Sequence, residues 1–153
     1  MSLVKYTFDL TPANQILSLL DANFAQMMIV AASGRSVGAI AAVSSVAAFT
    51  VGASDGTFEV SANINVTTAT THSFTATCAY KDETNTSRTL TLPFVLVAGS
   101  AIVNTVANAN GTVPYQGIPI HIRAKAGTSI TVATTGTFTN VAYNVEAIIK
   151  QLA

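Results

Sequence analysis

Residues 58–66 have the sequence Phe-Glu-Val-Ser-Ala-Asn-Ile-Asn-Val, and this stretch is the clearest evidence for the fold. Apolar side chains occupy every second position from Phe58 to Val66, and polar side chains occupy the positions between them. Successive side chains of a β-strand point to opposite faces of a sheet. The stretch therefore predicts a strand with one face in a core and the other in contact with solvent or a partner.

The same alternation recurs along the rest of the chain. Polar turn segments such as Asp82–Asn85 separate the alternating stretches roughly every ten residues, a spacing typical of a β-sandwich or jelly roll. We therefore predict an all-β, jelly-roll-like antiparallel β-sandwich over residues 49–153. Pro93 has no amide proton for a strand ladder, so we expect a bulge or an edge there. The further predicted strands are 72–80, 88–97, 100–106, 118–123, 129–133 and 138–149.

The first 48 residues follow other patterns and are predicted to form an N-terminal arm with a short helix. Residues 3–10 alternate as a short strand, and Thr11-Pro12 begins a helix that runs to about Met28. Residues 27–48 do not distinguish helix from strand, although 33–36 (Ser-Gly-Arg-Ser) are expected to turn. This part is expected to anchor the protein or contact another subunit, through Leu3, Tyr6, Phe8, Leu20 and Phe24.

The chain carries few charges for its length. Charged residues make up 9% of the 153 residues, and seven basic residues balance seven acidic ones. An average soluble domain has about 25% charged residues. A surface of neutral Thr, Ser, Asn and Ala is easily desolvated against another subunit, which favours assembly with protein partners. The lack of net charge argues against nucleic acid and anionic lipid as partners. Residues 24–49 are too often interrupted for a membrane span.

The sequence holds few groups that do chemistry: two histidines, one cysteine and seven scattered carboxylates. The pattern offers neither a nucleophile with its base nor metal ligands at suitable spacing. We therefore predict no enzyme activity, no cofactor and no metal. Cys78 alternates with Phe74 and Ala76 and is expected in the core. His72 and His121 are expected to be surface or interface imidazoles.

The most concentrated polar feature is residues 121–125, His-Ile-Arg-Ala-Lys. On a strand, His121, Arg123 and Lys125 face the same way. The pattern has two interpretations. It is either a solvated strand face, or a contact stripe for a neighbouring subunit or an anionic glycan.

Four segments resemble a family of small tailed-phage structural proteins. They are residues 51–63 (VGASDGTFEVSAN), 70–74 (TTHSF), 117–128 (GIPIHIRAKAGT) and 134–138 (TTGTF). The resemblance implies a jelly-roll-like domain, commonly trimeric, of the kind found in capsid decoration (cement) proteins and in head or tail fibre components. No catalytic residue comes with it. Residues 19–25 (LLDANFA) also resemble the helical stretch that opens many phage tail and fibre proteins.

Together these observations lead to a phage virion structural protein, with two hypotheses for its role. The leading one is a homotrimeric capsid decoration protein that binds the major capsid protein and stabilises the shell by bridging capsid subunits. Residues 1–10 do not have the pattern of a signal peptide, so we expect synthesis in the host cytoplasm and a final location on the capsid surface. The alternative is a receptor- or carbohydrate-binding tip domain of a fibre, in which Tyr115, Gln116 and Arg123 contact a host glycan.

Overall fold

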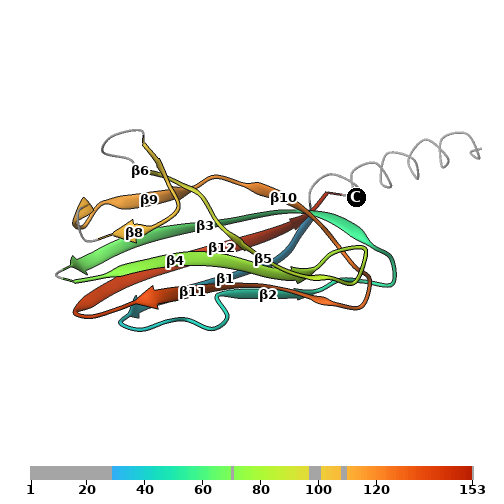
Figure 1. The fold of residues 1–153 in the computed structure, drawn as a ribbon, viewed down its shortest axis with the longest axis horizontal. Coiled ribbons are helices and arrows are strands. Elements are labelled where there is room, and N and C mark those ends of the chain that lie inside the picture. Colours follow the sequence, from blue (N-terminus) through green and yellow to red (C-terminus); the bar gives the residue numbers. More distant parts are fainter. Residues whose placement is uncertain (1–28, 70, 97–100, 108–109, 153) are drawn as a thin grey trace, which may run out of the picture.

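A computed structural model describes residues 29–69, 71–96, 101–107 and 110–152 (Figure 1). The predicted N-terminal strand and helix lie outside these residues, as do the five predicted contact residues Leu3, Tyr6, Phe8, Leu20 and Phe24. The described residues form twelve strands: β1 (Ile29–Ala39), β2 (Ala47–Thr50), β3 (Gly56–Ala69), β4 (Ser73–Lys81), β5 (Ser87–Thr91), β6 (Phe94–Leu96), β7 (Ile102–Val103), β8 (Val106–Ala107), β9 (Pro114–Gly117), β10 (Ile120–Ala124), β11 (Ser129–Thr137) and β12 (Val141–Gln151).

The strands form two antiparallel sheets, here called sheet A and sheet B. Sheet A has the order β1-β12-β3-β9-β6-β7, with β10 also paired to β3. Sheet B has the order β2-β11-β4-β5, with β8 also paired to β4. Strands β1 to β4 alternate between the sheets, and the last two strands return between them, β12 beside β1 and β3, β11 beside β2 and β4. This strand order is that of a jelly roll, so the predicted all-β, jelly-roll-like sandwich is confirmed.

The core lies between the two sheets and follows the alternation in the sequence. Every second side chain of β3, β4 and β12 is buried, and the polar side chains between them point outward. Phe74 is fully buried, with its ring centroid 4.6 Å from that of Tyr143 and 4.8 Å from that of Phe138. Aromatic pairs at such distances add to the hydrophobic stabilisation of a core.

A buried hydrogen-bonded chain holds the connection between β1 and β2 to this core. The hydroxyl of Tyr143 donates to the carbonyl oxygen of Ala41 at 2.7 Å, and it also lies 2.7 Å from Oγ1 of Thr134. Because a phenol has one proton, the hydroxyl of Thr134 must donate to Tyr143. Oγ1 of Thr134 in turn accepts the amide of Val43 at 2.9 Å. The hydroxyls of Tyr143 and Thr134 are thus both satisfied, as burial in a core requires.

The boundary that we predicted between residues 48 and 49 is wrong, because the sandwich already contains β1 and β2. Strand β1 pairs along β12 from Ile29 to Ala39, and the predicted turn at 33–36 lies in the middle of this strand. A side chain at Gly34 would collide with the carbonyl oxygen of Val46. Gly34 therefore allows the chain entering β2 to cross closely over β1, and this packing requirement resembles a turn signal in the sequence.

The single strand predicted over residues 88–97 is divided at Pro93. Strand β5 belongs to sheet B and β6 to sheet A, so the chain changes sheets at Leu92-Pro93. The amide of Leu92 still donates to the carbonyl of Ala76 at 2.9 Å, whereas the carbonyl of Pro93 accepts the amide of Ile118 at 2.9 Å. A residue without an amide proton suits this crossover because neither sheet needs its donor. Among the described residues, no helix is long and apolar enough to cross a membrane.

Candidate functional site

The outer face of sheet B is chemically uniform and consists mainly of Thr and Ala. Pairing places these residues in rows across the strands: Thr77 lies between Ala133 and Thr91, and Thr131 between Ala48 and Ala79. In the outward positions of β2, β4 and β11, the one charged residue is Lys81 at the end of β4. We call this surface the Thr/Ala face. Its short side chains lose little conformational entropy when a partner covers them.

Exposed large apolar side chains gather at one edge of sheet A. Within the part of the chain that the structure describes, six large apolar side chains are exposed, and four of them lie between residues 29 and 40. These four are Ile29, Val30, Val37 (66% exposed) and Ile40 (70% exposed). Among the described residues, strand β1 ends the order of sheet A and pairs with β12 alone. An apolar edge strand with unpaired backbone groups favours contact with another chain.

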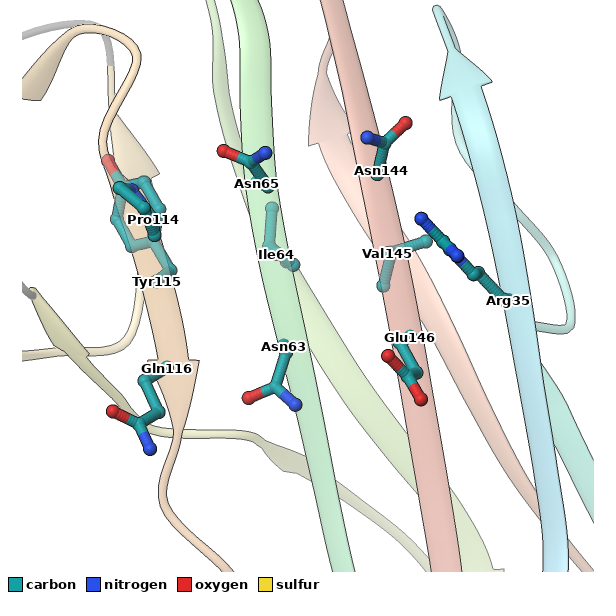
Figure 2. A pocket seen from close by; sticks show the side chains of 10 residues that line it. All are labelled: Arg35, Asn63, Ile64, Asn65, Pro114, Tyr115, Gln116, Asn144, Val145 and Glu146. Atoms are coloured by element: carbon teal, nitrogen blue, oxygen red, sulfur yellow. The ribbon is translucent and has the colours of Figure 1, made fainter.

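A groove runs across the outer face of sheet A and has a volume of about 410 Å³. It crosses β1, β12, β3 and β9, and Figure 2 shows polar side chains from all four strands around it. The outward positions carry Arg35, Asn63, Asn65, Gln116, Asn144 and Glu146, whereas Ile64, Tyr115 and Val145 belong to the core beneath. We call this site the amide groove.

Two of these amides are held by the backbone of the neighbouring strand. Oδ1 of Asn63 accepts the amide of Gly117 at 2.9 Å, and Oδ1 of Asn144 accepts the amide of Gly38 at 2.8 Å. These bonds fix the orientation of both side chains and leave their Nδ2 groups as donors. Arg35 and Glu146 lie opposite each other in the β1–β12 register, yet they form no ion pair in the described structure.

Next to the groove, sheet A carries a small ion cluster around Glu59. Oε1 of Glu59 lies 2.9 Å from Nζ of Lys150, and Oε2 lies 3.6 Å from Nε2 of His121. The hydrogen bond from Lys150, assisted by His121, holds the pKa of Glu59 below its usual value, against the opposing effect of burial. Glu59 is therefore ionised at neutral pH and neutralises part of the positive charge on this face.

The structure partly separates the predicted stripe of His121, Arg123 and Lys125. His121 and Arg123 point outward from β10 as expected, but Lys125 lies beyond the end of β10 in the following turn. Each of the first two already has an acidic neighbour, Glu59 for His121 and Glu83 for Arg123, the latter at 2.6 Å. The role of the stripe as a contact for a subunit or glycan stays a prediction.

The turn between β4 and β5 is organised by Asp82. Its Oδ1 accepts the amides of Thr84 and Thr86 and the hydroxyl of Thr84, and its Oδ2 lies 2.7 Å from Nε of Arg88. The hydrogen bonds from Thr84, together with those from Arg88 and Thr86, hold the pKa of Asp82 far below its usual range. The predicted turn is confirmed, and both carboxylate oxygens are used to form it.

His72 is not the surface imidazole that we expected. It is 3% exposed, and neither ring nitrogen has a hydrogen-bond partner in the structure. Burial lowers the pKa of the imidazole, so His72 is neutral at pH 7. The alternation of Phe74, Ala76 and Cys78 extends to residue 72 and indicated this inward position. Cys78 is buried as predicted, and burial raises the pKa of its thiol to about 12.

The glycan contacts predicted for the alternative function are spread over the fold. Tyr115 is 1% exposed and packs against Phe94, so the expectation that it meets a ligand is wrong. Gln116 lines the amide groove, and Arg123 lies on β10 beside Glu83. Among the described residues, no group of three or more His, Cys, Asp or Glu side chains is placed to hold a metal ion.

Comparisons with known proteins found β-rich structures of low similarity. No protein-family model matches it, and no curated protein matches its sequence. A crystal structure of the SPBc2 prophage-derived protein YomS is 11% identical with a TM-score of 0.38, over 76% of this chain and 92% of that chain. The CBM22-1 xylan-binding domain of Paenibacillus barcinonensis Xyn10C is 11% identical with a TM-score of 0.39, over 77% of this chain and 70% of that chain. Values this low are no evidence for a shared function, so the fold assignment depends on the strand order.

Proposed function

We propose that this protein is a phage virion structural protein, specifically a homotrimeric capsid decoration protein that stabilises the shell by bridging its subunits. The observation that carries the proposal is the gathering of exposed apolar side chains on edge strand β1 and Ile40. Isolated exposed apolar residues are normal on a monomer, whereas exposed pairs at both ends of one edge strand, Ile29 with Val30 and Val37 with Ile40, are costly in water. Burial against another copy of the chain removes that cost.

A decoration protein needs a second contact, with the major capsid protein, and the Thr/Ala face suits it. This face is neutral and made of short side chains, so its desolvation costs little and no opposite charge has to be matched. Three copies joined through β1 would bring three such faces to the shell at once. Simultaneous engagement raises the overall affinity far above that of a single face.

The self-association step is tested by the mass of the protein in solution. We expect a trimer for the full chain and a monomer for the double variant Val37→Lys/Ile40→Lys, because two lysines per chain would face each other in the contact. Ile102→Lys is the matched control, since Ile102 is equally exposed (70%) but lies on β7 at the opposite edge of sheet A. A wild-type protein that stays monomeric at high concentration would overturn the trimer.

The role in the virion is tested by copy number and by deletion. A decoration protein should be present in copies comparable to the major capsid protein, and virions without it should open at lower heat or osmotic stress. A fibre tip domain should be scarce, and its loss should abolish adsorption and leave the shell intact. The second result would replace the proposed function with the receptor-binding alternative.

A further inference from the structure

From the amide groove we infer a second binding site, which takes a neutral glycan and lies on the opposite side of the sandwich from the proposed shell contact. The groove lies on the outer face of sheet A, whereas the Thr/Ala face lies on sheet B, on the other side of the sandwich. Its volume of about 410 Å³ falls within the range of roughly 300–1,000 Å³ that is usual for ligand sites. The site is therefore large enough for part of a glycan chain.

The hydrogen-bonding groups of the groove are arranged in two rows across the strands. The first row runs from Arg35 through Glu146 to Asn63, and the second runs from Asn144 through Asn65. Figure 2 shows these side chains on the neighbouring strands β1, β12 and β3, where they line the groove. Donors and acceptors thus alternate over a short distance, which matches a ligand that presents many hydroxyl groups, each both a donor and an acceptor.

The charges in the groove give no net attraction for a charged ligand. Arg35 contributes one positive charge and Glu146 one negative charge, and the other four outward side chains are amides. Glu146 would repel the carboxylates of an acidic polysaccharide or the phosphates of a nucleic acid, and this repulsion offsets their attraction to Arg35. Arg35 and Glu146 also remain free to bind a ligand, because neither forms an ion pair within the described part of the chain.

The fold prepares the site before any ligand arrives. The bonds from Gly38 to Asn144 and from Gly117 to Asn63 hold two of the amides in place from the neighbouring strands. A side chain at Gly117 would collide with the carbonyl oxygen of Ala62, so glycine allows β9 to approach β3 closely enough for its bond to Asn63. Preorganised groups lose less entropy on binding. Tyr115 lies below the surface, so no aromatic ring is available there for stacking on a sugar. We therefore expect a dissociation constant of about 1 mM for one site.

The inference is tested with the full chain by NMR titration, using neutral glucan, mannan and galactan hexasaccharides. At least one of them should shift the backbone amides around Asn63, Asn65 and Gln116. Asn65→Ala/Gln116→Ala should weaken this binding more than tenfold without changing the unfolding midpoint, since neither side chain holds a neighbouring strand in the way that Asn63 and Asn144 do. Thr75→Ala/Thr77→Ala is the matched control, with two outward polar side chains removed from sheet B, and should bind like wild type.

The acidic hexasaccharide of polygalacturonate, titrated in the same way, tests the selectivity. We expect it to bind at least tenfold more weakly than the best neutral hexasaccharide, and Glu146→Gln should reduce that difference. Tighter binding of the acidic sugar would overturn the neutral ligand class. If the groove amides did not shift with any neutral hexasaccharide at 10-fold the expected dissociation constant, the site itself would be refuted, whatever the oligomeric state of the protein.

Discussion

The two outer faces of the sandwich are built on similar strands, yet they differ in the chemistry of their side chains. On sheet B the outward positions hold Thr and Ala, as in the row Ala133, Thr77 and Thr91. On sheet A they hold amides and charges, as in the row Arg35, Glu146 and Asn63. One molecule of low overall charge therefore has two kinds of face: sheet B has short side chains without charge in its middle, and sheet A has amides and charges that are only partly satisfied, by backbone amides of neighbouring strands.

The difference in side-chain chemistry determines which kind of partner each face can bind. A covered Thr/Ala face loses few hydrogen bonds to water and little side-chain freedom, so a flat protein surface is a sufficient partner. A covered amide groove loses many hydrogen bonds to water, and a ligand must replace them. The first face suits assembly and the second suits a ligand rich in hydroxyl groups.

The largest expected effect comes from a substitution in the core. It should impair binding at both faces, because both are built on that core. Phe74→Ala removes a fully buried ring that packs against Phe138 and Tyr143. We expect a loss of about 3–5 kcal/mol in the free energy of unfolding, measured by urea denaturation. Glycan binding and self-association should weaken together as the folded fraction falls. A loss of one function alone, at unchanged stability, would show that the two faces do not depend on a common core.

A charge on the Thr/Ala face is the next largest change, and it should affect one face only. Ala133→Asp places a carboxylate in the middle of this face, which should weaken binding to virions that lack the protein by about 100-fold, since an unmatched charge at an interface costs several kcal/mol. Ser61→Asp is the control on the outward side of β3 in sheet A. It should bind virions like wild type. Equal losses for the two variants would mean that the Thr/Ala face is not the shell contact.

The next prediction concerns buried His72 and the pH dependence of stability. Burial lowers the pKa of His72 in the folded protein, so below about pH 6.5 the unfolded chain binds a proton that the folded chain does not. The stabilisation that comes from neutral His72 is fully present above that pH, and the free energy of unfolding should fall as the pH decreases toward the folded pKa. His72→Leu should reduce this slope. The same slope in His72→Leu as in wild type would contradict the prediction.

The smallest effect concerns the ion cluster on sheet A. Lys150→Met removes the closer partner of Glu59 and should lower stability at pH 7 by less than about 1 kcal/mol, as is usual for a partly exposed ion pair. The pKa of Glu59 is lowered by Lys150, so the pair stabilises the fold above the ordinary carboxylate pKa and loses this effect as the pH falls through the folded pKa. The difference between wild type and variant should therefore disappear once the pH falls below the folded pKa of Glu59. A larger cost, or one that persists in acid, would assign Lys150 a packing role; Lys125→Met serves as the control.

Much of the fold was predictable because a strand carries its own periodicity. The alternation from Phe58 to Val66 and from Phe74 to Cys78 identified which side chains are buried, and Asp82 identified a turn. The same rule places residue 72 inside, but the polar nature of histidine led us to expect it on the surface. Strand β1 was missed because Ala, Ser and Gly have weak preferences, and its structure depends on pairing with β12 and on the passage of Val46 over Gly34.

The class of the fold, the composition of the core and the scarcity of charge follow from the amino-acid sequence, because they depend on neighbouring residues or on simple counts. The strand order, the apolar edge at β1 and the amide groove depend on how the strands pack in three dimensions. The groove joins Arg35, Asn63, Gln116 and Asn144, which are far apart in the chain and meet only because β12 returns between β1 and β3. Contacts between distant segments depend on the packing of whole strands, so a local pattern of residues does not predict them.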